Sequence, residues 1–117
     1  MKTPIDGIYA VYLTGSAGQG FALLSLQDGT IFGSDQSGAK YDGKFIEEVG
    51  TGYKVDLTVG LPPNVPLIQG GVVGPQGERH TFEFLLPKDF LSRPFIRIEG
   101  RNGPVNARFE VLRMRDD

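Results

Sequence analysis

Two apolar segments near the start of the chain constrain its fold more than any other feature. They cover residues 6–13 and 20–26, and both consist mainly of β-branched, aromatic and large aliphatic residues, which favour β-strands. Residues 14–19 between them are rich in glycine and contain nothing that would extend a helix, which is typical of a turn. The pattern predicts a β-hairpin.

Both faces of this hairpin are apolar, whereas a strand with one face in water alternates apolar with polar side chains. In the first strand one face carries Ile8, Ala10 and Tyr12, and the other carries Tyr9, Val11 and Leu13. One face can enter the interior of the domain. The other needs a second sheet, a ligand or a second copy of the protein, and the sequence leaves open which face points inward.

The rest of the chain predicts six further strands, at residues 30–33, 39–46, 53–59, 78–86, 95–100 and 105–111. Residues 53–59 alternate most cleanly between apolar and polar side chains. Asp28-Gly29 and Asn102-Gly103 predict type I′ hairpin turns. Residues 60–77 contain four prolines and five glycines, so we expect an irregular segment that covers one end of the sheet. Its apolar residues Leu67, Ile68, Val72 and Val73 would pack there.

Eight short strands in sequential order, with no convincing helix, predict an all-β fold. We expect an eight-stranded up-and-down antiparallel barrel in which the last strand pairs with the first. The 17 glycines among 117 residues are about twice the average share of roughly 7%, which suits a protein with many tight turns. The length fits a single β-barrel domain over residues 1–117.

Pairing of the last strand with the first would bring its apolar end beside the outer face of the hairpin. A contiguous apolar patch of this kind usually marks an interface, and a twofold homodimer is the commonest way to cover one. The predicted dimer interface consists of Tyr9, Val11, Leu13, Leu24, Leu112 and Met114.

The predicted interior is rich in aromatic residues. An eight-stranded barrel encloses just enough room for its side chains or for one small apolar molecule. A packed core is the favoured interpretation, because large rings would fill much of the space, and a ligand cavity is the alternative. The inward rings, which would contact such a ligand, are Tyr41, Phe45, Tyr53, Phe82, Phe84 and Phe109.

Charge and composition exclude several classes of partner and cofactor. The net charge of −2 gives no field that would attract nucleic acid or an anionic membrane, so we expect neither as a direct partner. The absence of cysteine excludes disulfides and thiolate metal sites. No segment approaches the length of a membrane helix or contains a signal sequence. We therefore expect a cytoplasmic protein without a cofactor.

No residue pattern predicts catalysis. The glycines of residues 15–20 precede a strand rather than the helix that a nucleotide-binding loop requires. His80 is the only histidine, and we expect it to be half-exposed on a strand and to bind no metal. No serine has the spacing of a nucleophile elbow. The acidic residues Asp35, Asp42, Glu47 and Glu48 lie in or beside turns, where carboxylates are ordinary. We expect no enzymatic activity.

Several short motifs in order carry a family resemblance. They are Asp6-Gly-Ile-Tyr, Gly18-Gln-Gly20, Asp28-Gly29 followed by Gly33-Ser-Asp35, and Tyr41-Asp-Gly-Lys-Phe45. Together they resemble the GrlR family of negative regulators of bacterial type III secretion. The resemblance implies an eight-stranded, lipocalin-like barrel, a homodimer, and regulation by sequestering a transcriptional activator without contacting DNA.

One motif of that family differs in this chain. Activator recognition in the best-known type depends on an exposed run of four acidic residues after the fourth strand, where this chain has only Glu47 and Glu48, followed by Val49 and Gly50. The resemblance makes Glu47 and Glu48 the candidate contacts to a partner protein. The leading hypothesis is a dimeric, non-enzymatic regulator that acts by protein–protein interaction, and the alternative is a carrier of a small apolar ligand.

Overall fold

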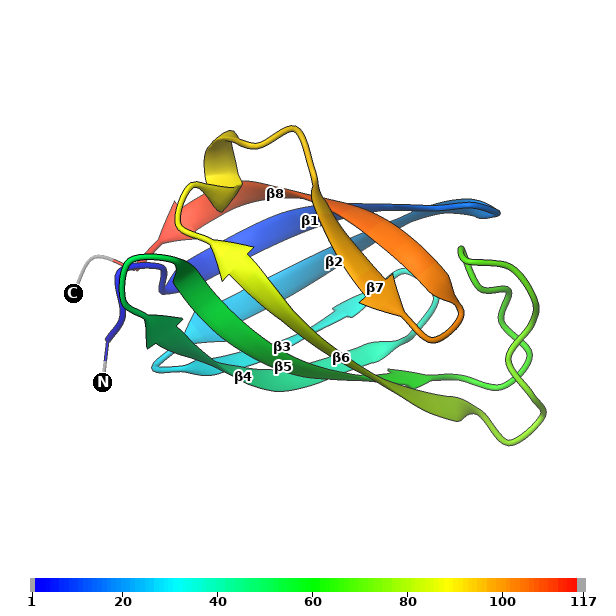
Figure 1. The fold of residues 1–117 in the computed structure, drawn as a ribbon. Coiled ribbons are helices and arrows are strands. Elements are labelled where there is room, and N and C mark those ends of the chain that lie inside the picture. Colours follow the sequence, from blue (N-terminus) through cyan, green and yellow to red (C-terminus); the bar gives the residue numbers. More distant parts are fainter. Residues whose placement is uncertain (1, 116–117) are drawn as a thin grey trace.

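The computed structural model describes residues 2–115, which form eight β-strands and one 3-10 turn (Figure 1). The strands are β1 (Gly7–Gly15), β2 (Gly18–Gln27), β3 (Thr30–Asp35), β4 (Lys40–Glu48), β5 (Gly52–Leu61), β6 (Glu78–Pro87), β7 (Ile96–Gly100) and β8 (Gly103–Met114), and the turn η1 spans Phe90–Ser92. Over this range no helix is long and apolar enough to cross a membrane. The predicted all-β fold is confirmed.

The strands form one antiparallel sheet that curls into a nearly closed up-and-down barrel. Their order is β6-β5-β4-β3-β2-β1-β8-β7, so the last strand pairs with the first, as predicted. The seam lies between β6 and β7, which end the order of paired strands. Gly100 of β7 lies against β6 there, and a Cβ on it would come 2.7 Å from the ring of Phe82. Glycine at this position lets the two edges approach each other.

Of the two predicted type I′ turns, one is confirmed and one is wrong. Asp28 and Gly29 have φ of 54° and 86°, the left-handed values that this turn requires. In the second hairpin Gly100 pairs with Gly103, so the turn residues are Arg101 and Asn102. Neither residue has a positive φ, so this is not a type I′ turn, and the prediction was wrong in position and in type. Gly103 adopts a φ of 117° just after the turn.

Strand register decides which face of the first hairpin points inward. Tyr9 pairs with Leu24, and Val11 pairs with Phe109, so these side chains share the concave face and are buried. A bulge in the pairing of β1 with β8 leaves Leu112 between the partners of Ile8 and Tyr9. Bulges add an unpaired residue of this kind.

Most of the predicted dimer interface is therefore wrong. Tyr9, Val11 and Leu24 lie in the core, and Leu13 is partly buried and packs against it. Met114 lies 3.7 Å from the Tyr9 hydroxyl through its sulfur atom. Side chains enclosed by their own barrel cannot cover a partner. Of the six residues only Leu112 and Met114 are exposed, at 54% and 41%.

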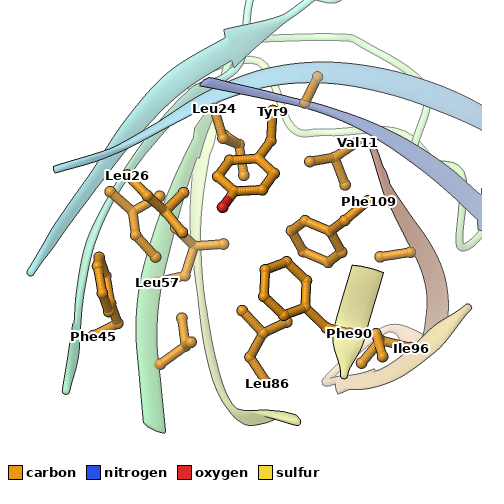
Figure 2. Close-up of a cluster of buried hydrophobic side chains, with 14 of the residues drawn as sticks. Tyr9, Val11, Leu24, Leu26, Phe45, Leu57, Leu86, Phe90, Ile96 and Phe109 are labelled. Carbon is orange, nitrogen blue, oxygen red and sulfur yellow. The ribbon is translucent and has the colours of Figure 1, made fainter. Parts of the chain in front are cut away.

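Large side chains fill the end of the barrel that lies near both termini (Figures 1 and 2). Phe90 of η1 enters this end and packs against Tyr9 and Phe109, with ring centroids 5.3–6.4 Å apart among the three. Phe45 and Leu86 continue the cluster. We call this region the filled end. Burial of such rings provides much of the stability of a small domain.

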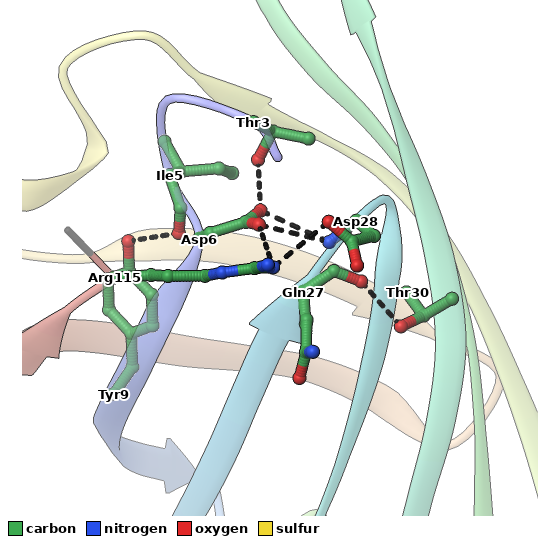
Figure 3. Close-up of polar contacts among 8 residues, drawn as sticks. All are labelled: Thr3, Ile5, Asp6, Tyr9, Gln27, Asp28, Thr30 and Arg115. Carbon is green, nitrogen blue, oxygen red and sulfur yellow. Dashed lines mark hydrogen bonds and ion pairs between the residues drawn. The ribbon is translucent and has the colours of Figure 1, made fainter. Parts of the chain in front are cut away.

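A buried carboxylate closes the filled end (Figure 3). Asp6 is 1% exposed and accepts hydrogen bonds from the Thr3 hydroxyl, from the Asp28 backbone N–H at 3.1 Å and from Arg115 at 3.1 Å. Burial alone would raise the pKa of Asp6, but these hydrogen bonds and the charge of Arg115 outweigh it, and the pKa lies below its ordinary value. The ionised carboxylate ties the N-terminal segment, the β2–β3 turn and the residue after β8 together.

Candidate ligand cavity

The opposite end of the barrel is hollow. A cavity of about 500 Å³ lies there, which is within the range of roughly 300–1,000 Å³ typical of small-molecule sites. We call this region the hollow end. Its walls are mainly apolar side chains that point inward from the strands, including Leu13, Leu57, Val59, Phe82, Phe84 and Ile98.

The cavity exists partly because two inward positions of β2 are glycines. Gly18 and Gly20 line it. A Cβ on Gly20 would make only ordinary contacts, at 3.7 Å to Leu13 and 3.9 Å to Ile68. At the filled end the same strand contributes Leu24 and Leu26 to the core. The missing side chains leave volume that no neighbour occupies.

The long loop between β5 and β6, residues 62–77, covers the hollow end. We call this loop the strap. The Ile68 carbonyl accepts a hydrogen bond of 2.7 Å from Ala17 N–H, and the Gln69 carbonyl accepts one of 3.1 Å from the Ser16 hydroxyl. On the other side Gln69 Nε2 donates to the Gly103 carbonyl at 3.1 Å. Two hairpin turns therefore hold the strap across the opening.

This arrangement confirms the prediction that residues 60–77 cover one end of the sheet. Leu67 and Ile68 line the cavity, and Val73 is buried. Val72 was predicted to pack there as well, but it is 63% exposed. Its backbone forms an isolated bridge with Pro66, and its side chain faces solvent.

His80 is the most enclosed polar side chain of the cavity wall. It is 3% exposed, and its Nε2 lies 2.8 Å from Glu78 Oε1. The other oxygen of Glu78 accepts a hydrogen bond of 3.0 Å from Gly74 N–H of the strap. The hydrogen bond from His80, followed by that from Gly74, lowers the pKa of Glu78.

The prediction of a half-exposed His80 was wrong. The pairing of Val59 with His80 and of Leu57 with Phe82 puts His80 on the same inward face as the phenylalanines of β6. Alternation through Phe82, Phe84 and Leu86 would have shown this if it had been extended back by one step.

A tyrosine and an aspartate form a second polar pair at the cavity. The Tyr41 hydroxyl donates to Asp35 Oδ2 at 2.8 Å, and Asp35 Oδ1 accepts hydrogen bonds from the backbone and hydroxyl of Ser37 and from Ala39 N–H. Burial, and then the charge of Asp35, raises the pKa of Tyr41. The phenol therefore stays neutral. Asp35 lies at a turn, as predicted, but it also organises that turn and lines the cavity.

The six predicted inward rings divide between the two ends of the barrel. All of them point inward, as expected. Tyr41, Phe82 and Phe84 line the cavity, whereas Phe45, Tyr53 and Phe109 belong to the packed cluster. The favoured interpretation of a fully packed interior is therefore correct for one end and wrong for the other.

The outer face of the first three strands carries exposed apolar side chains, namely Ile8, Tyr12, Phe21, Leu23 and Phe32. We call these five residues the outer patch. Tyr12 and Phe21 are cross-strand partners with ring centroids 5.2 Å apart. At the border of the patch the Arg108 guanidinium lies 4.3 Å above the Tyr12 ring, and the Tyr12 hydroxyl donates to Glu110.

The remaining predicted contacts lie elsewhere. Glu47 and Glu48 are exposed at the end of β4 that is remote from Tyr41. Over residues 2–115 no group of three or more histidine, aspartate or glutamate side chains could hold a metal ion. No family model, no curated protein and no solved structure matches this chain.

Proposed function

We propose that this chain is a non-enzymatic binding protein whose barrel holds one small, mainly apolar molecule. The observation that carries this proposal is the cavity of about 500 Å³ at the hollow end, walled by apolar side chains and closed by the strap. A domain gains stability by filling such a space, because an empty apolar cavity forfeits packing contacts. A void retained in a barrel whose other end is tightly packed favours a ligand.

The polar groups of the cavity support binding rather than catalysis. Tyr41 is engaged with Asp35, and His80 with Glu78. Such pairs fix the orientation of side chains around a ligand, which is how a few polar groups provide specificity in an apolar pocket.

Blocking the cavity tests the proposal. Gly20→Phe places a ring into the space beside Leu13 and Ile68, and Thr81→Phe adds the same ring on the outward face of β6. We expect N-phenyl-1-naphthylamine, an apolar fluorescent dye, to bind to the wild type and to Thr81→Phe but not to Gly20→Phe. Native mass spectrometry of protein from its own host should show a retained ligand mass. Equal dye binding by both variants would contradict the proposal.

The outer patch favours a second function, association of two copies of the chain. Its five apolar side chains occupy adjacent strands, and Arg108 and Glu110 at its border carry opposite charges. A twofold axis brings the same surface of both copies together, so each arginine can pair with the partner's glutamate. The regulatory role implied by the resemblance to the GrlR family, and the recognition of a partner protein through Glu47 and Glu48, stay predictions within this proposal.

Sedimentation equilibrium tests this association. We expect the wild type to dimerise and Leu23→Glu to weaken dimerisation by at least about fivefold, the effect expected for a residue at the centre of an interface. Thr81→Glu is the control, because it adds the same charge to an outward position remote from the patch. A wild type that stays monomeric at high concentration would end the proposal.

A further inference from the structure

One ring nitrogen of His80 is engaged and the other is not. Nε2 lies 2.8 Å from Glu78 Oε1, and over residues 2–115 no hydrogen bond involves Nδ1. Within the same range every fully buried side-chain nitrogen or oxygen has a hydrogen-bond partner. Nδ1 has none, so it is not fully buried. Since His80 is 97% buried and lines the cavity, its Nδ1 opens onto the cavity.

The contact with Glu78 determines whether Nδ1 donates or accepts a hydrogen bond. A carboxylate has no proton to give, so the proton in this contact belongs to Nε2 of the imidazole. In the neutral ring the other nitrogen then has a lone pair and acts as an acceptor. When the ring is neutral, Nδ1 therefore adds one hydrogen-bond acceptor to the cavity wall, beside the polar side chains of Asp35, Tyr41 and Gln69 that also line it.

From this geometry we infer that the ligand is a neutral amphiphile whose single hydroxyl or N–H group donates a hydrogen bond to Nδ1 of His80. This inference rests on the proposed function, because it names the class of molecule that the cavity holds. An apolar body would contact Leu57, Val59 and Phe82, and the donor would satisfy an acceptor that the body otherwise cuts off from water. A ligand without a donor would leave that acceptor unpaired at a cost in affinity.

The charges around the cavity argue against an anionic ligand. Asp35, Tyr41 and His80 provide the charged or titratable groups of the lining, with Glu78 directly behind the imidazole, and no lysine or arginine of the described chain lines the cavity. A ligand carboxylate would have to lose its water without gaining a cationic partner. A fatty alcohol fits this wall better than a fatty acid.

Three ligands with the same alkyl chain test the inference. Calorimetry would measure binding of 1-decanol, its methyl ether and decanoate to the wild type. One hydrogen bond changes affinity by about threefold to tenfold, so we expect 1-decanol to bind tighter than the ether by that factor and decanoate to bind weakest. The ether can accept but not donate, and is otherwise closely matched.

Two variants of His80 assign the effect to one nitrogen. His80→Gln places an amide N–H where Nε2 donates to Glu78, but offers nothing at the position of Nδ1. His80→Asn retains a polar atom near Nδ1 and loses the contact to Glu78. We expect the preference for alcohol over ether to fall to about one in His80→Gln and to persist in His80→Asn, with both folds checked by circular dichroism.

The outcomes separate this inference from the proposed function. Equal affinity of the wild type for alcohol and ether would overturn the inference and leave the apolar cavity site intact. Tightest binding of decanoate would also overturn it, since the ligand class would then be anionic. No binding of any of the three, together with dye binding that Gly20→Phe does not affect, would overturn the proposed function itself. An alcohol preference that survives in His80→Gln would show that another group accepts the hydrogen bond.

Discussion

The two ends of this barrel share the same strands but differ in what those strands place inside. At the filled end β1, β6 and β8 contribute Tyr9, Leu86 and Phe109, and Phe90 from η1 closes the space. At the hollow end β2 contributes Gly18 and Gly20, and the strap covers the space through hydrogen bonds to two hairpin turns. One continuous wall therefore supports a stable core and a cavity, because inward side-chain size changes along its length.

The closures of the two ends also differ in kind. The filled end is locked by the buried, ionised Asp6 together with the aromatic cluster. The strap depends on exposed or partly exposed hydrogen bonds to Ser16, Ala17 and Gly103. Each of those contributes on the order of 1 kcal/mol, so we expect the strap, apart from the part that buries Val73, to open at a cost well below that of unfolding. Under the proposed function, the filled end would provide stability and the hollow end would provide access for the ligand.

The largest expected contrast comes from making the same truncation at both ends. Phe90→Ala removes the ring that plugs the filled end, and we expect a loss of about 3–5 kcal/mol in the free energy of unfolding. Phe84→Ala removes a partly buried ring that packs against the core on one side and lines the cavity on the other, so less than half of that loss is expected. Urea denaturation of both variants measures the difference. Equal losses would show that the hollow end is packed in solution.

A smaller but pH-dependent effect is expected from the lock at the filled end. Asp6→Ala leaves Arg115 and the Asp28 N–H without their acceptor, and we expect a loss of about 3 kcal/mol at pH 7. Because the pKa of Asp6 is lowered in the folded state, its contribution is complete above the unfolded value near 3.8 and is lost as the pH falls through the folded value. The gap between wild type and variant should therefore narrow below pH 4.

The control for this pH effect is Asp28→Asn. Asparagine tolerates the left-handed φ of 54° at that position, and the backbone N–H that serves Asp6 is retained. We expect a much smaller loss, because Asp28 is partly exposed where Asp6 is fully buried. A stability difference between wild type and Asp6→Ala that stays constant from pH 7 to pH 2 would contradict an ionised lock.

Strands and their inward faces could be predicted wherever one face is apolar and the other polar. Residues 53–59 are the clearest case, and β5 extends beyond them only at its ends, over Gly52–Leu61. The first hairpin could not be oriented in this way, since both of its faces are apolar. Its orientation depends on the register of β1 against β8 and on the bulge before Tyr9. The local pattern of apolar and polar residues predicts neither of these.

The cavity could not be predicted because it is a property of several strands at one level of the barrel. The sequence supplies six inward rings, which suggested a full interior. Only the register shows that Phe45 and Phe109 gather at one end, while Gly20 lies at the level of Leu13. The inward orientation of His80 could have been predicted from the sequence, because it follows the alternation of its own strand.

The smallest expected effect sharpens the contrast in how the two ends close. A Cβ on Gly15 would come 2.3 Å from the Ile68 carbonyl oxygen, whereas one on Gly18 would make only ordinary contacts of 3.7 Å or more with Ile68. Gly15→Ala should displace the strap and break its hydrogen bond from Ala17, which is worth about 1 kcal/mol and so about a fivefold change in an equilibrium. Stopped-flow fluorescence should show the dye leaving Gly15→Ala about fivefold faster than the wild type, with little change in Gly18→Ala.

The filled end should be unaffected, so hydrogen exchange of Tyr9 and Val11 amides should match the wild type in both variants. Equal release rates in Gly15→Ala and Gly18→Ala would mean that the strap does not control access, and that ligand enters elsewhere, with the unpaired seam between β6 and β7 as the next route to test.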